Sequence, residues 1–258
     1  GIMPTAKELL LEHLEYTFEK EGWQPPLGIA VAGLTAEQAA WKPAPGRHSI
    51  WQIVRHVLHW KRGVLSAWVG DPRDYQWMNN SDWPEVSGDQ GAWERDVKEL
   101  HDMYTELRQR LEEINDEDLD QARPWYRDVP PRALAQRLLH MSTHDVYHAG
   151  QIQYLRALQR VPADRFFNAA GWRGDVAVLR EVLDAHPDLL NAFDRSGWTA
   201  LQLAAYTGHM EAVRFLLDRG ADVHAVSRNE VAATALKSAE VAGHAAIAEV
   251  LRANGASR

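Results

Sequence analysis

The longest periodic segment of the chain, residues 131–160, constrains the fold most strongly, because ionisable side chains fall among its apolar ones. At about 100° per residue, its helical period predicts an inward face that can be read directly from the sequence. The residues expected on that face are Leu134, Leu138, Met141, Asp145, His148, Ile152 and Leu155. A carboxylate and an imidazole in a core are unfavourable unless they are paired or bind a metal. The segment therefore predicts a packed helix that contains a polar site.

Three histidines in this segment favour a metal site. His140, His144 and His148 follow at four-residue steps, so neighbouring Cβ atoms lie about 5–6 Å apart on one helical face. Two such imidazoles can reach one ion, and zinc takes nitrogen ligands at about 2.0–2.1 Å. The alternative is a helix that carries solvated or core histidines without a ligand. We favour a metal because Gly150-Gln151 follows the stacked pair and a further candidate lies elsewhere in the chain.

That further candidate is His56. Ile53 and Trp60 lie one helical turn to either side of it, so we expect His56 to point inward. His59 has polar neighbours on its own face, and we expect it to lie in water. Taken alone, His56 is as well explained as a hydrogen-bonded core histidine as it is as a ligand. Its assignment to a metal depends on the need of the later pair for a third nitrogen.

The remainder of the first half predicts three more long helices. Thr5 and Glu8 form a capping box at the start of the first, and Ser49 caps the second. The three helices are expected at residues 5–21, 49–69 and 91–114, with a loop at 71–90 and a connection at 116–130. Together with 131–160 they predict a four-helix bundle, a fold whose interior commonly holds metals between facing helices.

Composition excludes several classes of protein. None of the 258 residues is cysteine, so disulfides, cysteine-based zinc fingers and a cysteine nucleophile are excluded, and thiol chemistry would need an outside thiol. A net charge of -8 argues against a nucleic acid or an anionic membrane as partner, because either favours a basic surface. No apolar run approaches the roughly 20 residues of a membrane-spanning helix, and no signal peptide is evident, so we expect a cytoplasmic protein.

The second half differs in composition and repeats itself. Nine of the eleven tryptophans precede residue 160, whereas alanine and regularly spaced glycine dominate after it. Residues 167–175 align with 201–209 at an offset of 34, and 236–244 follow at an offset of 35. We therefore predict two domains, 1–161 and 164–258, the second being about three stacked repeats. The short link between them has no Gly/Ser tract, which favours a fixed arrangement.

Residues of about 5–160 resemble the DinB-like (YfiT-like) superfamily of metal-dependent bundles, through the segments 49–60 and 144–152. In that family the first segment supplies one histidine and the second supplies two. The resemblance implies that His56, His144 and His148 face a divalent cation, and that His140 lies behind the ligands or in the pocket wall. Three imidazoles accept Zn, Ni, Fe or Mn.

Residues 164–258 resemble the ankyrin repeat, with Gly197–Leu201 in the place of its Thr-Pro-Leu-His segment. Ala200 and Gln202 depart from the usual Pro and His, so we expect weaker local hydrogen bonding there. The resemblance implies that His209 and His244 are structural. It also implies a protein partner bound through Tyr206 and the turn tips, which are residues 192–198 and 227–231. The alternative is a stack that only covers or braces the bundle.

The predicted fold is all-α, a DinB/YfiT-like four-helix bundle followed by a short ankyrin stack. Three protein ligands with open positions are typical of a catalytic or substrate-binding metal site. The DinB-like resemblance implies transfer of a low-molecular-weight thiol to a small-molecule electrophile, and hydrolysis by metal-bound water is the other chemistry that these ligands permit. Asp145 is the predicted base or orienting carboxylate, or else a salt-bridge partner of an arginine in the bundle. The second hypothesis is a non-enzymatic metal-binding scaffold or sensor. A homodimer is also possible, because such bundles often pair.

Overall fold

The structure, a computed structural model, describes residues 3–69, 81–123 and 130–257. Regular elements in these ranges are helical apart from the two-residue strands β1 (Ala122–Arg123) and β2 (Arg132–Ala133), which pair antiparallel. The all-α prediction is therefore confirmed. The chain divides into two compact units, residues 1–155 and 156–258. Of the described helices, none combines the length and the apolar character needed to cross a bilayer.

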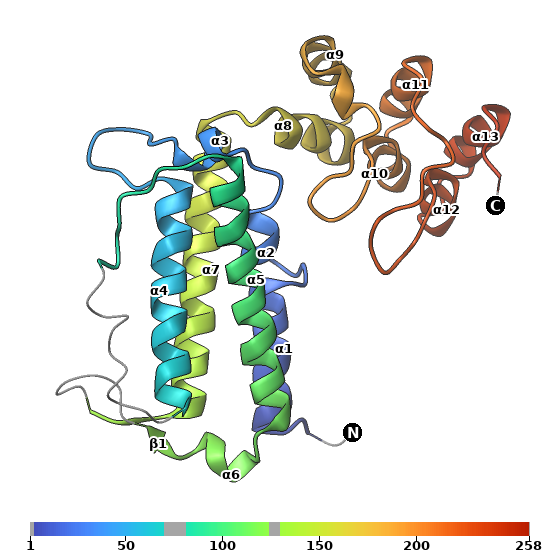
Figure 1. The fold of residues 1–258 in the computed structure, drawn as a ribbon. Coiled ribbons are helices and arrows are strands. Elements are labelled where there is room, and N and C mark those ends of the chain that lie inside the picture. The colour runs from blue at the N-terminus through green and yellow to red at the C-terminus, as the bar shows by residue number, and fades with distance from the viewer. Residues whose placement is uncertain (1–2, 70–80, 124–129, 258) are drawn as a thin grey trace. The chain divides into compact units, whose positions relative to one another are not determined.

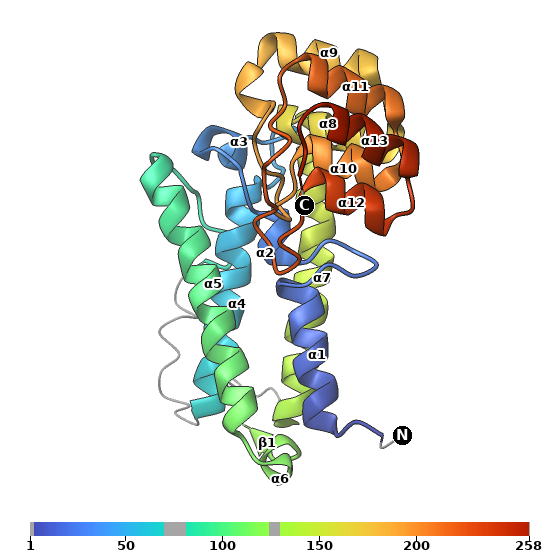
Figure 2. The same ribbon diagram turned by 90° about the vertical axis from the view of Figure 1, so that its right-hand side faces the viewer.

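The described residues of the first unit include four long helices. These helices run lengthwise beside one another (Figures 1 and 2). They are α1 (Ala6–Phe18), α4 (Ile50–Val69), α5 (Gln90–Glu113) and α7 (Leu134–Leu158). In Figure 1, α1 and α7 run upward and α4 and α5 run downward. The short helices are α2 (Leu27–Ala30), α3 (Ala36–Ala40) and α6 (Asp116–Leu119). The four predicted long helices are all present, with ends that differ by a few residues.

The first two long helices begin where their caps dictate. Thr5 Oγ1 accepts from the Glu8 amide, and the Glu8 carboxylate accepts from the Thr5 amide at 2.7 Å. Ser49 and Gln52 exchange the same two bonds at 3.1 Å each at the start of α4. The predicted inward face of α7 is buried along its whole length, including its carboxylate and its imidazole. The bundle core therefore surrounds polar groups, as expected from the sequence.

The described residues of the second unit form three helix pairs, which are arranged in two layers (Figures 1 and 2). One layer holds α8 (Pro162–Asn168, continued by a π-turn at Ala169–Arg173), α10 (Ala200–Thr207) and α12 (Ala235–Val241). The other layer holds α9 (Val176–Ala185), α11 (Met210–Asp218) and α13 (Ala245–Ala253). A shared apolar core of leucine, alanine and phenylalanine side chains joins the pairs. Each pair corresponds to one of the repeats found in the sequence.

Glycines fix the spacing between neighbouring repeats. Gly174 and Gly208 have φ values of 61° and 85°, and a Cβ on either would lie within 2.8 Å of a histidine ring in the next repeat. The rings belong to His209 and His244, and Nε2 of His244 lies 3.0 Å from the Tyr206 carbonyl oxygen. Both histidines therefore have the structural position that the resemblance implied.

The expectation of weak hydrogen bonding around Gln202 is wrong. Its Oε1 accepts from the Thr199 amide at 2.9 Å, which completes a capping box. Its Nε2 donates to the carbonyl oxygens of Ala225 and Ala233 at 2.8 and 2.9 Å. A buried glutamine amide thus satisfies both a helix start and the loop of the following repeat.

Candidate metal centre

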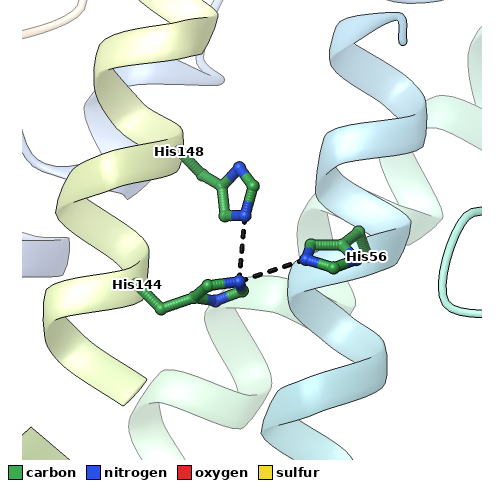
Figure 3. A group of neighbouring side chains, drawn as sticks. All are labelled: His56, His144 and His148. Carbon is green, nitrogen blue, oxygen red and sulfur yellow. Dashed lines mark hydrogen bonds between the residues drawn. The ribbon is translucent and has the colours of Figure 1, made fainter. Parts of the chain in front are cut away.

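Three imidazoles from two helices converge inside the bundle (Figure 3). His56 lies on α4, and His144 and His148 lie one turn apart on α7. Nε2 of His144 is 3.1 Å from Nε2 of His56 and 2.9 Å from Nε2 of His148. One ring nitrogen from each residue lies within 4.8 Å of the others. The fold therefore brings together the three histidines that the sequence pointed to.

The groups behind two of the rings determine where their protons lie. Nδ1 of His56 is 2.9 Å from the Asp82 carbonyl oxygen, and Nδ1 of His148 is 2.7 Å from Gln151 Oε1. Gln151 Nε2 donates to the Tyr147 hydroxyl at 3.1 Å, which is consistent with this orientation of the amide. Both oxygens can only accept, so each Nδ1 carries a proton and each Nε2 presents a lone pair.

This arrangement of protons suits a cation. Nε2 of His144 faces the lone pairs of both His56 and His148. Nε2 of His144 has at most one hydrogen to donate. Without a cation between the rings, at least one of the two contacts would therefore bring two lone pairs together. Metal-bound histidines commonly donate their second ring nitrogen to a carbonyl or carboxamide oxygen, as His56 and His148 do. The three side chains therefore fit a divalent cation.

The site keeps its imidazoles neutral. Burial lowers the pKa of His144 to about 3, with further contributions from His148, His56 and Lys61. Burial lowers the pKa of His148 to about 4, and it also lowers the pKa of His56. Neutral imidazole is the form that binds metals, so competition from protons is weak near neutral pH.

A loop holds the ring of His56 from its outer side. The indole of Trp83 stacks between His48 and His56, with centroid distances of 3.8 and 3.9 Å and interplanar angles of 12° and 10°. The neighbouring Asp82 carbonyl accepts from the same His56 ring. Sequence reasoning missed Asp82 and Trp83, because they lie in a non-periodic loop where helical spacing gives no signal.

Asp145 lies in a buried ion pair, and its partner is a lysine and not the arginine that the sequence-based alternative expected. Its Oδ2 is 2.6 Å from Nζ of Lys61 on α4, and the two side chains are 0% and 1% exposed. Burial raises the pKa of the Asp145 carboxyl, and the Lys61 ammonium opposes that change. Sequence reasoning also missed Lys61, although it interrupts the apolar face of α4. The other members of that face are Ile50, Val54, Val57 and Val64, all buried.

The prediction that His59 lies in water is wrong, since it is 7% exposed. On the same helix, two other residues contact the segment that follows residue 80. Gln52 donates to the Pro84 carbonyl at 3.1 Å, and His56 contacts the Asp82 carbonyl. A helical wheel assigns polar neighbours to solvent, and it cannot anticipate a loop that packs over them.

A pocket of about 300 Å³ lies beside His144. Its lining residues are Trp60, Val64, Arg132, Arg137, His140, Met141 and His144. His144 belongs both to the histidine cluster and to the pocket wall, so the pocket lies next to the cluster. His140 lies in the wall, one of the two positions that the resemblance implied.

The fold and the site define an all-α protein of two modules, a helical bundle with a candidate metal centre and a stack of helical repeats. Comparison with protein families gives the same division: the sequence model of the DinB superfamily matches residues 27–152, and that of ankyrin repeats in three copies matches residues 166–257. The chain thus joins an N-terminal DinB domain to C-terminal ankyrin repeats.

Similar proteins of known sequence or structure share only parts of the chain. It is 37% identical over 100 residues to the NAD-capped RNA hydrolase NUDT12 of Pongo abelii, a match that covers 38% of this chain and 21% of that protein. It is 40% identical over 67 residues to ankyrin repeat, SAM and basic leucine zipper domain-containing protein 1 of Mus musculus, covering 26% and 14%. The chain thus spans at most about a fifth of the length of these curated relatives. A DinB-like protein from Bacillus cereus has a TM-score of 0.44 and 19% identity, covering 58% of this chain and 91% of that one.

Proposed function

We propose that His56, His144 and His148 hold one divalent metal ion, and that the bundle is a metal-dependent enzyme acting on a small molecule. The observation that carries this proposal is the convergence of three Nε2 atoms, two of which present lone pairs because their Nδ1 atoms donate to oxygen. Zn, Ni, Fe and Mn are all compatible with three imidazoles. The proposed functional modules are residues 1–161 and 164–258.

A bound ion with three protein ligands supplies Lewis acidity and lowers the pKa of a coordinated water or thiol. Transfer of a low-molecular-weight thiol is our preferred reaction, on the strength of the DinB-like motifs, and hydrolysis is the alternative. Because the chain has no cysteine, the thiol would come from solution. The chain's own contribution is to hold His56 and His148 in one tautomer and to keep a pocket open beside His144.

For Asp145 we propose a positioning role. Its ion pair with Lys61 links α4 to α7 within the helices that carry the histidines. A carboxylate that is fully buried against an ammonium is poorly placed to collect protons from a substrate, whereas it is well placed to fix the distance between two helices. An Asp145→Asn variant should therefore weaken metal binding and leave the pH profile of any turnover unchanged.

The first test is metal content. We expect the purified chain to carry about one ion, measured by elemental analysis, because three imidazoles form a complete protein ligand set for an open site. His56→Ala, His144→Ala and His148→Ala should each lose the ion while keeping the helical circular dichroism signal. His140→Ala is the matched control, one turn from His144 on the same helix, and should keep its metal. Metal content that is unchanged in all three variants would contradict the proposal.

The second candidate function is a protein-binding scaffold in which the metal has a sensory or structural role. The ankyrin repeats favour it, because such repeats serve protein–protein interaction, here through the tips 192–198 and 227–231. Turnover assays of the metal-loaded chain with several thiols and electrophiles separate the two functions. Metal-dependent turnover supports the enzyme. Absence of turnover together with a tight protein partner, or unfolding when the metal is removed, supports the scaffold.

A further inference from the structure

The pocket beside His144 has two chemically different walls. Trp60, Val64 and Met141 provide apolar surface from α4 and α7. Arg132 and Arg137 provide two guanidinium groups, the first from β2 and the second from the first turn of α7. Pockets for small organic molecules typically combine an apolar lining with a few polar groups that fix orientation. This pocket has that composition, and the charged groups among its lining residues are the two guanidinium groups.

The backbone holds both arginines at the pocket. The pairing of Arg132 with Arg123 in the short β-ribbon fixes the start of α7. Nη2 of Arg137 donates to the Arg123 carbonyl at 3.1 Å, and its side chain is only 7% exposed. Burial lowers the pKa of the Arg137 guanidinium, and the charge of Arg132 lowers it further. Two cations that disfavour each other are thus kept in one small space.

Arg132 differs from other arginines of the bundle. Several of those pair with carboxylates: Arg55 with Asp96, Arg62 with Glu99, Arg108 with Glu15 and Arg110 with Glu106. Within the described part of the chain Arg132 has no carboxylate partner, and its Nη1 lies 3.4 Å from Nδ1 of His140. The chain has 36 acidic residues, so carboxylates are abundant, yet none of the described ones neutralises this guanidinium. A bound anion would do so.

We propose that this pocket binds a small organic anion, as an extension of the proposed metal-dependent function. Its carboxylate or phosphate pairs with Arg132 and Arg137, and its apolar part packs against Trp60, Val64 and Met141. Guanidinium groups suit this role because their planar donors match both oxyanions in a bidentate manner. The opposite end of the molecule then lies on the His144 side, where the metal would be held.

The test uses three probes that share a phenyl ring and differ in charge: phenylacetate, phenyl phosphate and the neutral phenylacetamide. Binding to the intact chain is measured by isothermal titration calorimetry or saturation-transfer NMR. We expect at least one of the anions to bind, with phenylacetamide weaker by about tenfold or more, because a charged hydrogen-bond pair is lost. The tighter anion identifies the carboxylate or the phosphate as the preferred group. Equal binding of the amide and the anions, or no binding of either anion, would overturn the proposal.

Arg132→Gln and Arg137→Gln should each weaken binding of the anion by about tenfold. Arg110→Gln, outside the pocket on α5, is the control and should bind as the wild type does. Arg137 is buried, so its variant can fail to fold, but Arg132 is exposed and its variant tests the proposal without that risk. Wild-type affinity in Arg132→Gln, in a chain whose circular dichroism is unchanged, would overturn it.

The same titrations in zinc-loaded and chelator-treated protein separate this proposal from the metal site. If the chain binds no metal but binds the anion through Arg132, the anion pocket is supported and the metal-dependent function is contradicted. If metal binds in the wild type and in both arginine variants but no anion binds, the pocket proposal alone fails. Anion binding that vanishes with the metal and is insensitive to both arginine changes would mean that the anion coordinates the ion directly, which also overturns the arginine pocket.

Discussion

The bundle buries ionisable side chains between its helices, including His56, Lys61, Asp145 and His148, whereas the polar groups buried in the repeats are mainly neutral hydroxyls and an amide. The repeat residues are Thr199, Gln202, Ser227 and Ser238, with Arg156 as a charged exception that pairs with Asp164. Gln202 satisfies backbone groups of its own stack. The histidines of the bundle face one another instead. Buried polar groups therefore serve structure in the repeats, whereas in the bundle they include the candidate metal centre.

The largest effect is expected from breaking the buried ion pair. Lys61→Met leaves the Asp145 carboxylate buried without its cation, which should cost about 3–5 kcal/mol of stability. Denaturant unfolding followed by tryptophan fluorescence reports mainly on the bundle, since nine of the eleven tryptophans precede residue 160. The double variant Lys61→Met/Asp145→Leu is the control and should recover most of the loss. A single variant as stable as the wild type would contradict the view that the pair holds α4 against α7.

A smaller effect is expected in the repeats, without consequence for the metal. Gly208→Ala places a Cβ 2.7 Å from the His244 ring in a left-handed conformation, and should destabilise the stack by about 1–3 kcal/mol. Gly243→Ala is the matched control, because its φ of 79° is similar and nothing lies within 4 Å of the added Cβ. Thermal unfolding by circular dichroism should show the greater loss for Gly208→Ala. Equal losses of melting temperature in the two variants would mean that the strained backbone, and not the contact with the His244 ring, destabilises the stack. Changed metal affinity in either variant would contradict the separation of the two regions.

Removing the aromatic support of His56 should weaken metal binding by about tenfold, the lower end of the effect usual for groups behind metal ligands. Trp83→Ala takes away the ring that stacks on His56 at 3.9 Å. Competition with a chromophoric chelator measures the change in zinc affinity. Trp23→Ala, a fully exposed tryptophan, is the control. If both variants bind zinc equally well, Trp83 does not position the ligand.

The smallest effect is expected on how the stability of the metal-free chain depends on pH. The pKa of His148 is about 4 in the folded bundle, so unfolding below the ordinary histidine pKa of about 6.5 is accompanied by proton uptake. The free energy of unfolding is therefore at its full value above a pH of about 6.5, and it falls as the pH drops toward 4. Between pH 7.5 and 6 the loss should be under about 1 kcal/mol for each such histidine. Urea unfolding in the presence of a chelator measures it, and His148→Ala should show a shallower dependence. An identical slope in that variant would contradict the assignment.

Helical periodicity predicted most of the architecture, because the four long helices and the three repeats bury regular faces. The inward face of α7 was read correctly down to Asp145 and His148, and the offsets of 34 and 35 residues located the repeats. Four-residue spacing alone also paired His144 with His148. That His56 meets them depends on how α4 packs against α7, which spacing within one helix does not determine.

The missed residues fall into two groups. Asp82 and Trp83 lie in a loop, where their contacts with His56 depend on the path of the chain and leave no periodic trace. Lys61 was detectable in the sequence, because it places a charge in the apolar face of α4. In the structure it pairs with the Asp145 carboxylate. Searching both helices for interrupted apolar faces would have found the pair.

The central claim is that imidazoles from α4 and α7 hold one ion between them. Anomalous diffraction from crystals of the intact chain, recorded at the absorption edge of the metal found by elemental analysis, tests it most directly. The account predicts one strong peak, bound by Nε2 of His56, His144 and His148 at about 2.0–2.2 Å, with space for an outside ligand on the pocket side. A peak elsewhere in the molecule, or a His56 ring directed away from the other two, would contradict it.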